Sequence, residues 1–90
     1  MANPFRAGDI VLDSERHALK VLVIDEERGI AHVRFYDGDF ADAEAVLAAR
    51  NEKGGLTWTI GHVPLDLATL DPATCVTVVH EEVRDDELEG

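Results

Sequence analysis

The stretch from residue 8 to residue 36 constrains the fold of this chain more than any other part of the sequence. It contains three apolar runs rich in strand-forming residues, at residues 10–12, 17–25 and 30–36. The polar connection DEERG joins the last two runs, and its Gly29 stands where a tight turn needs a positive φ. The pattern predicts a β-hairpin preceded by a short strand, and therefore a mainly antiparallel β domain.

The two long strands of this stretch differ in how apolar their faces are. Alternate residues of an extended strand point to opposite faces. Both faces of residues 17–25 are largely apolar, which predicts a central strand covered on both sides. Residues 30–36 place three core candidates on one face and, on the other, the mixed polar and aromatic set His32, Arg34 and Tyr36.

The sequence after this hairpin predicts one substantial helix, at residues 40–53. Asp39 or Asp42 can cap its start, and the pair Gly54-Gly55 can supply its end and the exit turn. Four apolar residues fall at helical spacing and are expected to pack inward. They are Phe40, Ala43, Val46 and Leu47. Asp42 and Arg50 are expected to be exposed.

The last third of the chain predicts two more strands. Period-two alternation at residues 56–62 predicts a fourth strand, which we expect Gly61 and Pro64 to end. Residues 65–70 are too short for a substantial helix and predict one helical turn, with Asp66 as its cap. Residues 75–80 predict the fifth strand.

Five short strands with one helix between the third and the fourth predict a bent antiparallel sheet or a small barrel. The opening F-x-x-G-D-I-V-L, followed by K-V-L-V-I-D and G-x-A-H-V-R-F-Y, resembles SH3-like barrels of the Tudor and KOW type over residues 5–36. We therefore expect a mainly β (α+β) fold in which residues 1–80 form a single SH3-like β domain. The acidic residues 81–90 are expected to form a solvated, flexible tail.

Acidic residues outnumber lysine and arginine by 19 to 8, which gives the chain a formal net charge of −11. Six of the acids follow His80, and the residues before it are acidic overall as well. Such a field repels a nucleic-acid backbone and an anionic membrane surface, so we expect neither as a partner. It favours basic protein or peptide partners and helps solubility.

The single cysteine, Cys75, allows no disulfide within the chain, which suits a reducing compartment. The first residues show no apolar stretch typical of a signal peptide. No apolar run approaches the ~20 residues that a membrane-spanning helix needs. We therefore expect a cytoplasmic protein, present as a monomer or a homodimer.

No strong motif for catalysis is apparent, and we expect no catalytic residue, metal or cofactor. Ser14 lies near Glu15 and His17, but without the surroundings of a catalytic nucleophile. Asp37-Gly38-Asp39 begins like a calcium loop and lacks the later ligands. The four histidines do not have the local spacing of metal ligands. They are His17, His32, His62 and His80.

The resemblance to Tudor-like barrels implies a site at aromatic residues near strand ends, which in that family can form a cage for a methylated cation. Tyr36, Phe40 and Trp58 flank the helical insertion, and Asp37 and Asp39 would complement a cation. We favour the alternative in which Phe40 and Trp58 belong to the core and Tyr36 covers an edge, because a short chain needs its few large side chains for packing. The candidate binding residues are His32, Arg34, Tyr36, Phe40 and Trp58.

Together these observations predict a small acidic protein that acts as a non-enzymatic protein-interaction module. It would bind a basic or extended peptide at a strand edge or at the face formed by His32, Arg34 and Tyr36. One alternative is an acidic regulatory or inhibitor protein, either a nucleic-acid mimic or an immunity-type partner, whose charge would gather on one face. Another is a small ligand-binding domain, which needs a concave site with convergent polar groups.

Overall fold

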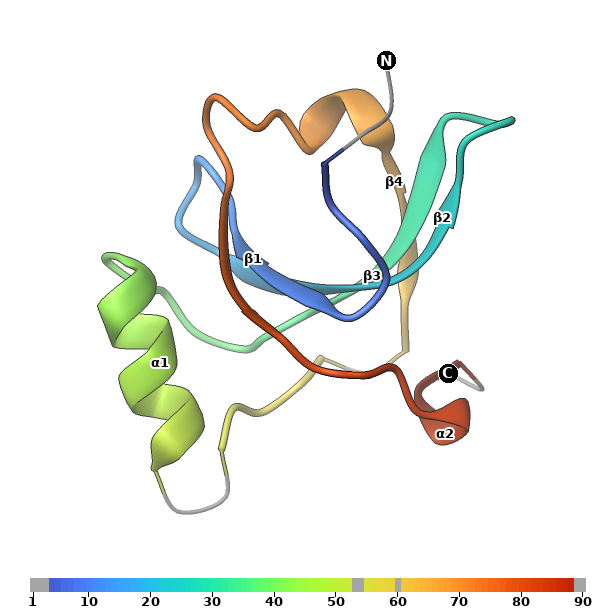
Figure 1. The fold of residues 1–90 in the computed structure, drawn as a ribbon. Helices are drawn as coiled ribbons and strands as arrows, with labels where there is room; N and C mark the ends of the chain where they lie inside the picture. The colour runs from blue at the N-terminus through green and yellow to red at the C-terminus, as the bar shows by residue number, and fades with distance from the viewer. Residues whose placement is uncertain (1–3, 53–54, 60, 89–90) are drawn as a thin grey trace.

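The computed structural model describes residues 4–52, 55–59 and 61–88. Within these ranges the chain forms five strands, one helix of nine residues and two shorter helical segments. In chain order they are β1 (Asp9–Leu12), β2 (Ala18–Asp25), β3 (Ile30–Phe35), the helix α1 (Ala43–Asn51), β4 (Val63–Asp66), the 3-10 turn η1 (Leu67–Thr69), β5 (Val76–His80) and the short helix α2 (Asp85–Leu88) (Figure 1).

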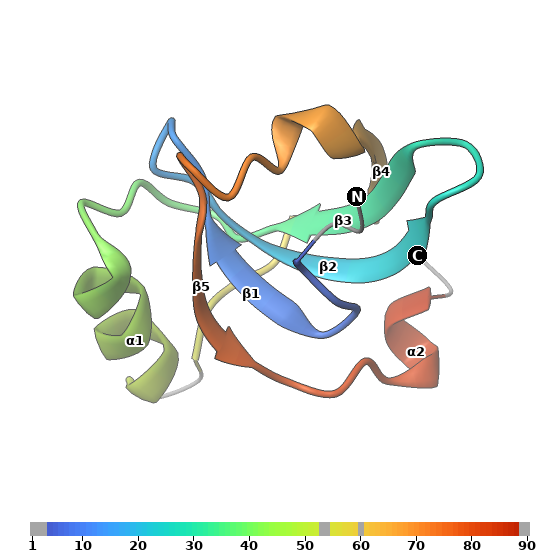
Figure 2. The ribbon, with the colours of Figure 1, turned by 45° about the horizontal axis from the view of Figure 1, so that its top comes forward.

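All five strands form one antiparallel sheet in the order β4-β3-β2-β1-β5. The structure confirms the predicted five-stranded sheet with a helix between the third and fourth strands. It is not closed into a barrel, because β4 and β5 lie at opposite edges. The register shifts at Ile10/Val11 and at Val21/Val23, and such irregularities bend an antiparallel pair. Figures 1 and 2 show the strong curvature of the sheet.

The two faces of the curved sheet carry separate apolar cores. Neighbouring strand residues point to opposite faces, so Ile10 and Val11 of β1 enter different cores. The buried members of the first core are Phe5, Val11, Leu19, Val21, Ala31, Val33, Leu70 and Cys75. Those of the second are Ile10, Leu12, Ala18, Tyr36, Phe40 and Val46. Because β2 lies between β1 and β3 and is buried at residues 18–22, its predicted central position is confirmed.

The helix α1 begins at Ala43, three residues later than predicted. Asp42 is its N-cap, and the Asp42 carboxylate accepts a hydrogen bond from the backbone N–H of Ala45 at 2.9 Å. Phe40 therefore precedes the helix, but it is buried in the second core together with Val46. Arg50 was expected to be exposed and is half-buried, because it pairs with Glu81 after β5. Figures 1 and 2 show α1 beside β5.

The fourth strand does not lie where the sequence predicts it. Among the described residues 55–59, Trp58 makes only an isolated bridge with Tyr36, and residue 60 lies outside the described residues. The strand β4 follows at Val63–Asp66 and contains Pro64, which was expected to end a strand. Proline lacks an N–H donor but is tolerated at a sheet edge, and β4 pairs with β3 alone. The predicted helical turn is confirmed as η1, with Asp66 as its cap.

The segment after His80 is not wholly solvated. Its described part, residues 81–88, includes α2, and Glu87 is only 8% exposed. The N–H of Glu81 donates to the carbonyl of Gly8 at 2.8 Å, which continues the pairing of β5 with β1. The carboxylate of Glu87 is buried because it meets Lys20, a cation inside the fold. None of the helices in the described ranges is long and apolar enough to cross a membrane.

Candidate functional site

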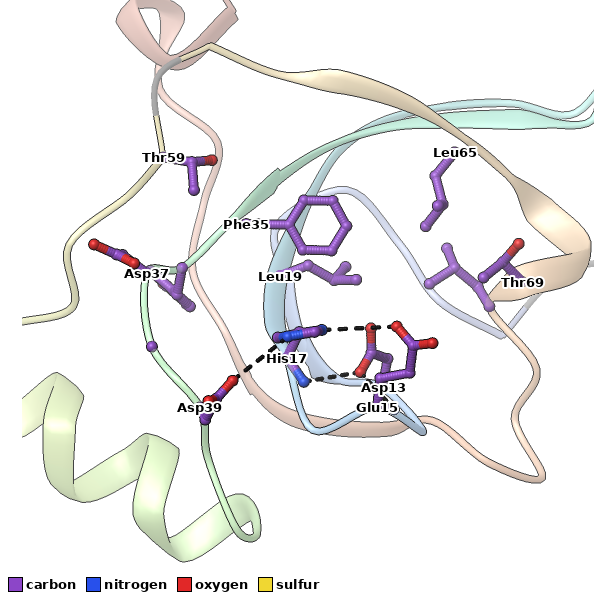
Figure 3. Close-up of a pocket in the computed structure, with 13 residues that line it drawn as sticks. Asp13, Glu15, His17, Leu19, Phe35, Asp37, Asp39, Thr59, Leu65 and Thr69 are labelled. Atoms are coloured by element: carbon purple, nitrogen blue, oxygen red, sulfur yellow. Dashed lines mark hydrogen bonds and ion pairs between the residues drawn. The ribbon is translucent and has the colours of Figure 1, made fainter.

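A pocket of about 620 Å³ opens on the face of the sheet that carries the first core. It lies between the β1–β2 loop, the segment that follows β3 and the turn η1 (Figure 3). We call it the acidic-rimmed pocket. Its lining residues are Asp13, Glu15, His17, Leu19, Phe35, Tyr36, Asp37, Gly38, Asp39, Thr59, Leu65, Thr69 and Leu70.

The floor of the acidic-rimmed pocket is apolar. Leu19 of β2 and Leu70 after η1 are both 1% exposed and belong to the first core. Phe35 and Leu65 are partly buried and pack against the same core. Figure 3 shows the Phe35 and Leu19 side chains in the middle of the site, with Leu65 of β4 and Thr69 of η1 to one side of them. The part of a ligand that reaches this floor must therefore be apolar.

Carboxylates surround this floor on two segments of the chain. Glu15 comes from the β1–β2 loop and Asp37 and Asp39 follow β3, and all three are exposed; Asp13 is partly buried. His17 bridges the two segments, because its Nε2 is 3.5 Å from Asp39 Oδ1 and its Nδ1 is 3.9 Å from Glu15 Oε2. Four acids around one opening create a negative potential that attracts cations.

The backbone holds the two acidic segments next to each other. The Oδ1 atom of Asp13 accepts hydrogen bonds from the N–H groups of Glu15 and His17, at 2.9 and 2.8 Å. Arg16 adopts a positive φ of 67°, which closes this short loop. The carbonyl of Arg16 then accepts the N–H of Phe40 at 3.1 Å, so the β1–β2 loop is tied to the segment after β3.

The described residues that come nearest to a metal-ligand set are also on this rim: Asp13, Glu15 and His17. One ligand atom from each lies within 4.8 Å of the others. Carboxylate and imidazole groups suit several divalent metals. However, Asp13 uses one oxygen to fold the loop, and Glu15 is exposed. We assign the cluster to the rim of the pocket. The alternating pattern Asp-x-Glu-x-His at residues 13–17 was the available signal in the sequence, and comparison of the histidines with one another missed it.

Two of the five candidate binding residues, His32 and Arg34, lie in β3 on the sheet face opposite the acidic-rimmed pocket. The His32 ring meets the His62 ring edge-on, with centroids 5.5 Å apart. The guanidinium of Arg34 lies 5.4 Å from the centre of the Trp58 ring. His32 Nδ1, His62 Nδ1 and Arg34 Nε are buried without a hydrogen-bond partner among the described residues. His80 lies elsewhere, with its Nδ1 2.9 Å from Asp9 Oδ1.

The three candidate aromatic residues pack with one another. Tyr36 is 4% exposed and Phe40 is 9% exposed, and both belong to the second core. Trp58 is partly buried and stacks on Tyr36, with ring centroids 3.5 Å apart. Burial, and next the negative charge of Glu81, raises the pKa of the Tyr36 hydroxyl above its usual value. This packing matches the favoured interpretation for Phe40, whereas Tyr36, which was expected to cover an edge, is buried in the second core. Binding at these five residues stays a prediction.

The described residues that line the acidic-rimmed pocket include no serine, cysteine or lysine. Cys75 is buried beneath η1, and its Sγ lies 3.6 Å from the carbonyl oxygen of Thr69. Comparisons with protein-family models, with curated proteins and with solved structures find no match to this chain. Its function is therefore inferred from the geometry of its own residues.

Proposed function

We propose that this chain is a non-enzymatic binding module that takes a basic peptide segment, with one cationic side chain seated in the acidic-rimmed pocket. The observation that carries the proposal is the combination of an apolar floor and a rim of four carboxylates in one pocket of about 620 Å³. Lysine and arginine have this same division, because an aliphatic stem leads to a charged head. The stem would lie over Leu19 and Phe35, and the head would reach Asp13, Glu15 or Asp39.

The expected affinity is modest. An exposed ion pair contributes at most about 1 kcal/mol, and burial of a few methylene groups adds about 0.8 kcal/mol each. A single side chain should therefore bind with a dissociation constant on the order of 0.1–1 mM. Flanking basic residues would strengthen binding through the acidic field of the chain, and added salt would weaken it.

An amide NMR titration tests the proposal directly. The probes are three short peptides with glycine on both sides of a central lysine, arginine or glutamine. We expect the lysine and arginine peptides to shift the amides of Asp39 and Thr69, which lie on opposite sides of the pocket. Equal shifts with the glutamine peptide, or shifts spread evenly over the exposed acids, would contradict the proposal.

A pair of matched variants separates the pocket from the general charge of the protein. Glu15→Gln combined with Asp39→Asn removes two rim charges and should weaken the lysine peptide about 5- to 20-fold. Glu26→Gln combined with Glu27→Gln removes the same charge from the exposed β2–β3 connection. The control pair should change the affinity less than twofold. A control effect as large as the rim effect would mean that only net charge matters.

We also propose that the sheet is an opened form of the SH3-like barrel that the sequence resembles. In its support, β1 pairs with both β2 and β5, and the single turn η1 connects β4 to β5. An experimental structure in solution, with contacts measured between the β4 and β5 edges, tests the relation to a barrel.

We also propose a cytoplasmic location, because the lone Cys75 is a buried free thiol.

A further inference from the structure

A second pocket, of about 530 Å³, lies on the other face of the sheet. Leu19 and Lys20 are neighbours in β2 and point to opposite faces, and Leu19 lines the acidic-rimmed pocket whereas Lys20 lines this one. Its walls come from β2, from α1, from residues 55–58 and from the segment after β5. We call it the Lys20 pocket.

The charges of the Lys20 pocket are divided between the folded body and the segment 81–88. The body contributes the cations Lys20 and Arg50, and the segment contributes three glutamates and one further cation, Arg84. The Nζ atom of Lys20 lies 2.9 Å from Oε1 of Glu87, and it donates to the backbone carbonyl of Glu82 at 3.2 Å. Arg50 Nε donates to Oε1 of Glu81 at 2.9 Å. The segment is therefore held by two cations at once.

Lys20 is an unusual side chain for the middle of a sheet. It is 3% exposed, and an ammonium group without a paired carboxylate is very costly in such a position. Among the described residues, Glu87 supplies the carboxylate that pairs with it. Lys20 thus forms a fixed, desolvated receptor for one carboxylate, and Arg50 provides a second receptor nearer to solvent.

The segment 81–88 does not satisfy this pocket completely. The Oε2 atom of Glu87 is buried without a hydrogen-bond partner among the described residues. A buried polar atom without a hydrogen-bond partner is unfavourable. An acidic segment that leaves no such atom unpaired would bind more favourably, which favours displacement of the contact within the chain.

We propose that Lys20 and Arg50 form a binding site for an acidic peptide segment of a partner, and that residues 81–88, which form one wall of the Lys20 pocket, cover these two cations as a competing segment of the same chain. The partner would place one carboxylate on Lys20 and a second on Arg50, as Glu87 and Glu81 do here. This site lies on the opposite face of the sheet from the acidic-rimmed pocket, although Tyr36 lines both pockets, and it takes ligands of the opposite charge.

Residues 81–88 belong to the same chain as Lys20 and Arg50, and this linkage affects how tightly the unaltered protein should bind an acidic peptide. A segment tethered in the same chain has an effective concentration of about the millimolar range, and a peptide in solution must compete with it. The overall charge of −11 also opposes an acidic peptide at long range, although ~0.15 M salt limits this repulsion to about 8 Å. We therefore expect weak binding to the unaltered chain and stronger binding once the segment is released.

The experiment uses the full chain and a synthetic peptide of sequence EEVRDDELEG, which corresponds to residues 81–90. Trp58 is the only tryptophan and lies in the pocket wall, so its fluorescence and its indole N–H resonance report occupancy. The releasing variant carries Glu81→Gln and Glu87→Gln. It should bind the peptide at least tenfold more tightly than the unaltered chain. Addition of Lys20→Met should reverse that gain by tenfold or more.

A matched control carries Asp85→Asn and Asp86→Asn, which remove the same charge from exposed residues of α2. It should bind the peptide no more than twofold better than the unaltered chain. Equal gains in the control and the releasing variant would overturn the proposal, as would no gain in a releasing variant that keeps a folded amide spectrum. If the double variant unfolds, Glu81→Gln alone serves, with an expected gain of at least threefold. Failure of this experiment leaves the basic-peptide titration unaffected, because that one reports on Asp39 and Thr69.

Discussion

Lys20 in β2 and Glu87 in α2 are 67 positions apart in the sequence, and Nζ of the lysine lies 2.9 Å from Oε1 of the glutamate. This pair fixes the last helix to the second strand. Figure 2 shows α2 at the end of the molecule away from α1, where the segment after β5 turns back toward the sheet. The pair therefore makes part of the acidic C-terminal sequence a structural element of the fold.

Replacement of Glu87 should lower the stability of the protein more than replacement of Lys20. Glu87→Gln leaves a buried lysine that can regain solvation only if the segment separates from the sheet, so we expect a loss of about 1–3 kcal/mol. Lys20→Met fills the same space without a charge, and Glu87 can turn to solvent, so we expect less than half of that loss. Urea unfolding followed by Trp58 fluorescence measures both. A larger loss of stability for Lys20→Met than for Glu87→Gln would contradict this expectation.

Substitution of Gly8, which directly precedes β1, should destabilise the fold more than substitution of Gly29. Its φ is +100°, and an added Cβ would lie 2.6 Å from the carbonyl oxygen of Glu81 and 2.7 Å from the His80 ring. Gly8→Ala should cost about 2–4 kcal/mol and loosen the pairing of β1 with the residues after β5. Gly29→Ala is the control, because its φ is +68° and, among the described residues apart from its chain neighbours, no heavy atom lies within 4 Å of the added Cβ.

Gly29→Ala should cost only about 1–2 kcal/mol, the usual strain of a left-handed conformation. Thermal or urea unfolding gives both free energies. Equal losses at the two glycines would mean that the chain near Gly8 can shift enough to accommodate a methyl group. In that case the close approach of Gly8 to Glu81 would not limit the fold.

The sequence predicts those parts of the fold that depend on local pattern. The alternation in β3 and the cap of η1 by Asp66 follow from neighbouring residues alone. The fourth strand was misplaced because Pro64 ends a central strand but is tolerated in an edge strand, and the sheet order is not readable from local alternation. The partner of Lys20 was missed for a similar reason, since Glu87 reaches it only after the chain has returned across the sheet.

The candidate site was harder to predict than the fold. Asp39 and His17 belong to separate connections, and the bond from Phe40 N–H to the Arg16 carbonyl brings those connections together. A pocket formed by two loops and a turn has no periodic signal. The short pattern at Asp13, Glu15 and His17 was visible, but only the folded loop shows that these side chains face a common opening.

The Tyr36 hydroxyl should make stability fall at alkaline pH. Burial, and then the charge of Glu81, raises the pKa of this hydroxyl in the folded protein above its value of about 10 in an unfolded chain. Above pH 10 the unfolded chain loses its proton while the folded chain keeps it. Stability should therefore be complete below pH 10 and decline above it, by at most about 1.4 kcal/mol per pH unit.

Two measurements check this expectation. Tyr36 is the only tyrosine, so its ultraviolet absorbance should show no ionisation at pH 10–11 while the protein stays folded. Tyr36→Phe should remove most of the decline that urea unfolding detects between pH 9 and pH 11. An unchanged slope in that variant would assign the decline to other groups.

Substitutions of Asp42 and Asp39 should separate an effect on stability from an effect on peptide binding. Asp42 caps α1 through its bond to Ala45 N–H, so Asp42→Ala should cost about 1 kcal/mol of stability and change affinity for the lysine peptide less than twofold. The Asp39 side chain is 95% exposed, and its ion pair is with His17 on the pocket rim. Asp39→Ala should cost less than about 0.5 kcal/mol of stability but weaken the peptide about 2- to 5-fold.

These two changes remove the same charge three positions apart, so a purely electrostatic effect of net charge would weaken binding equally in both variants. Unfolding curves and peptide titrations on the same two samples separate the possibilities. Equal weakening would move the proposed ligand away from the acidic-rimmed pocket. A loss of affinity confined to Asp39→Ala would place the cationic head beside His17, at the junction where the β1–β2 loop meets the segment after β3.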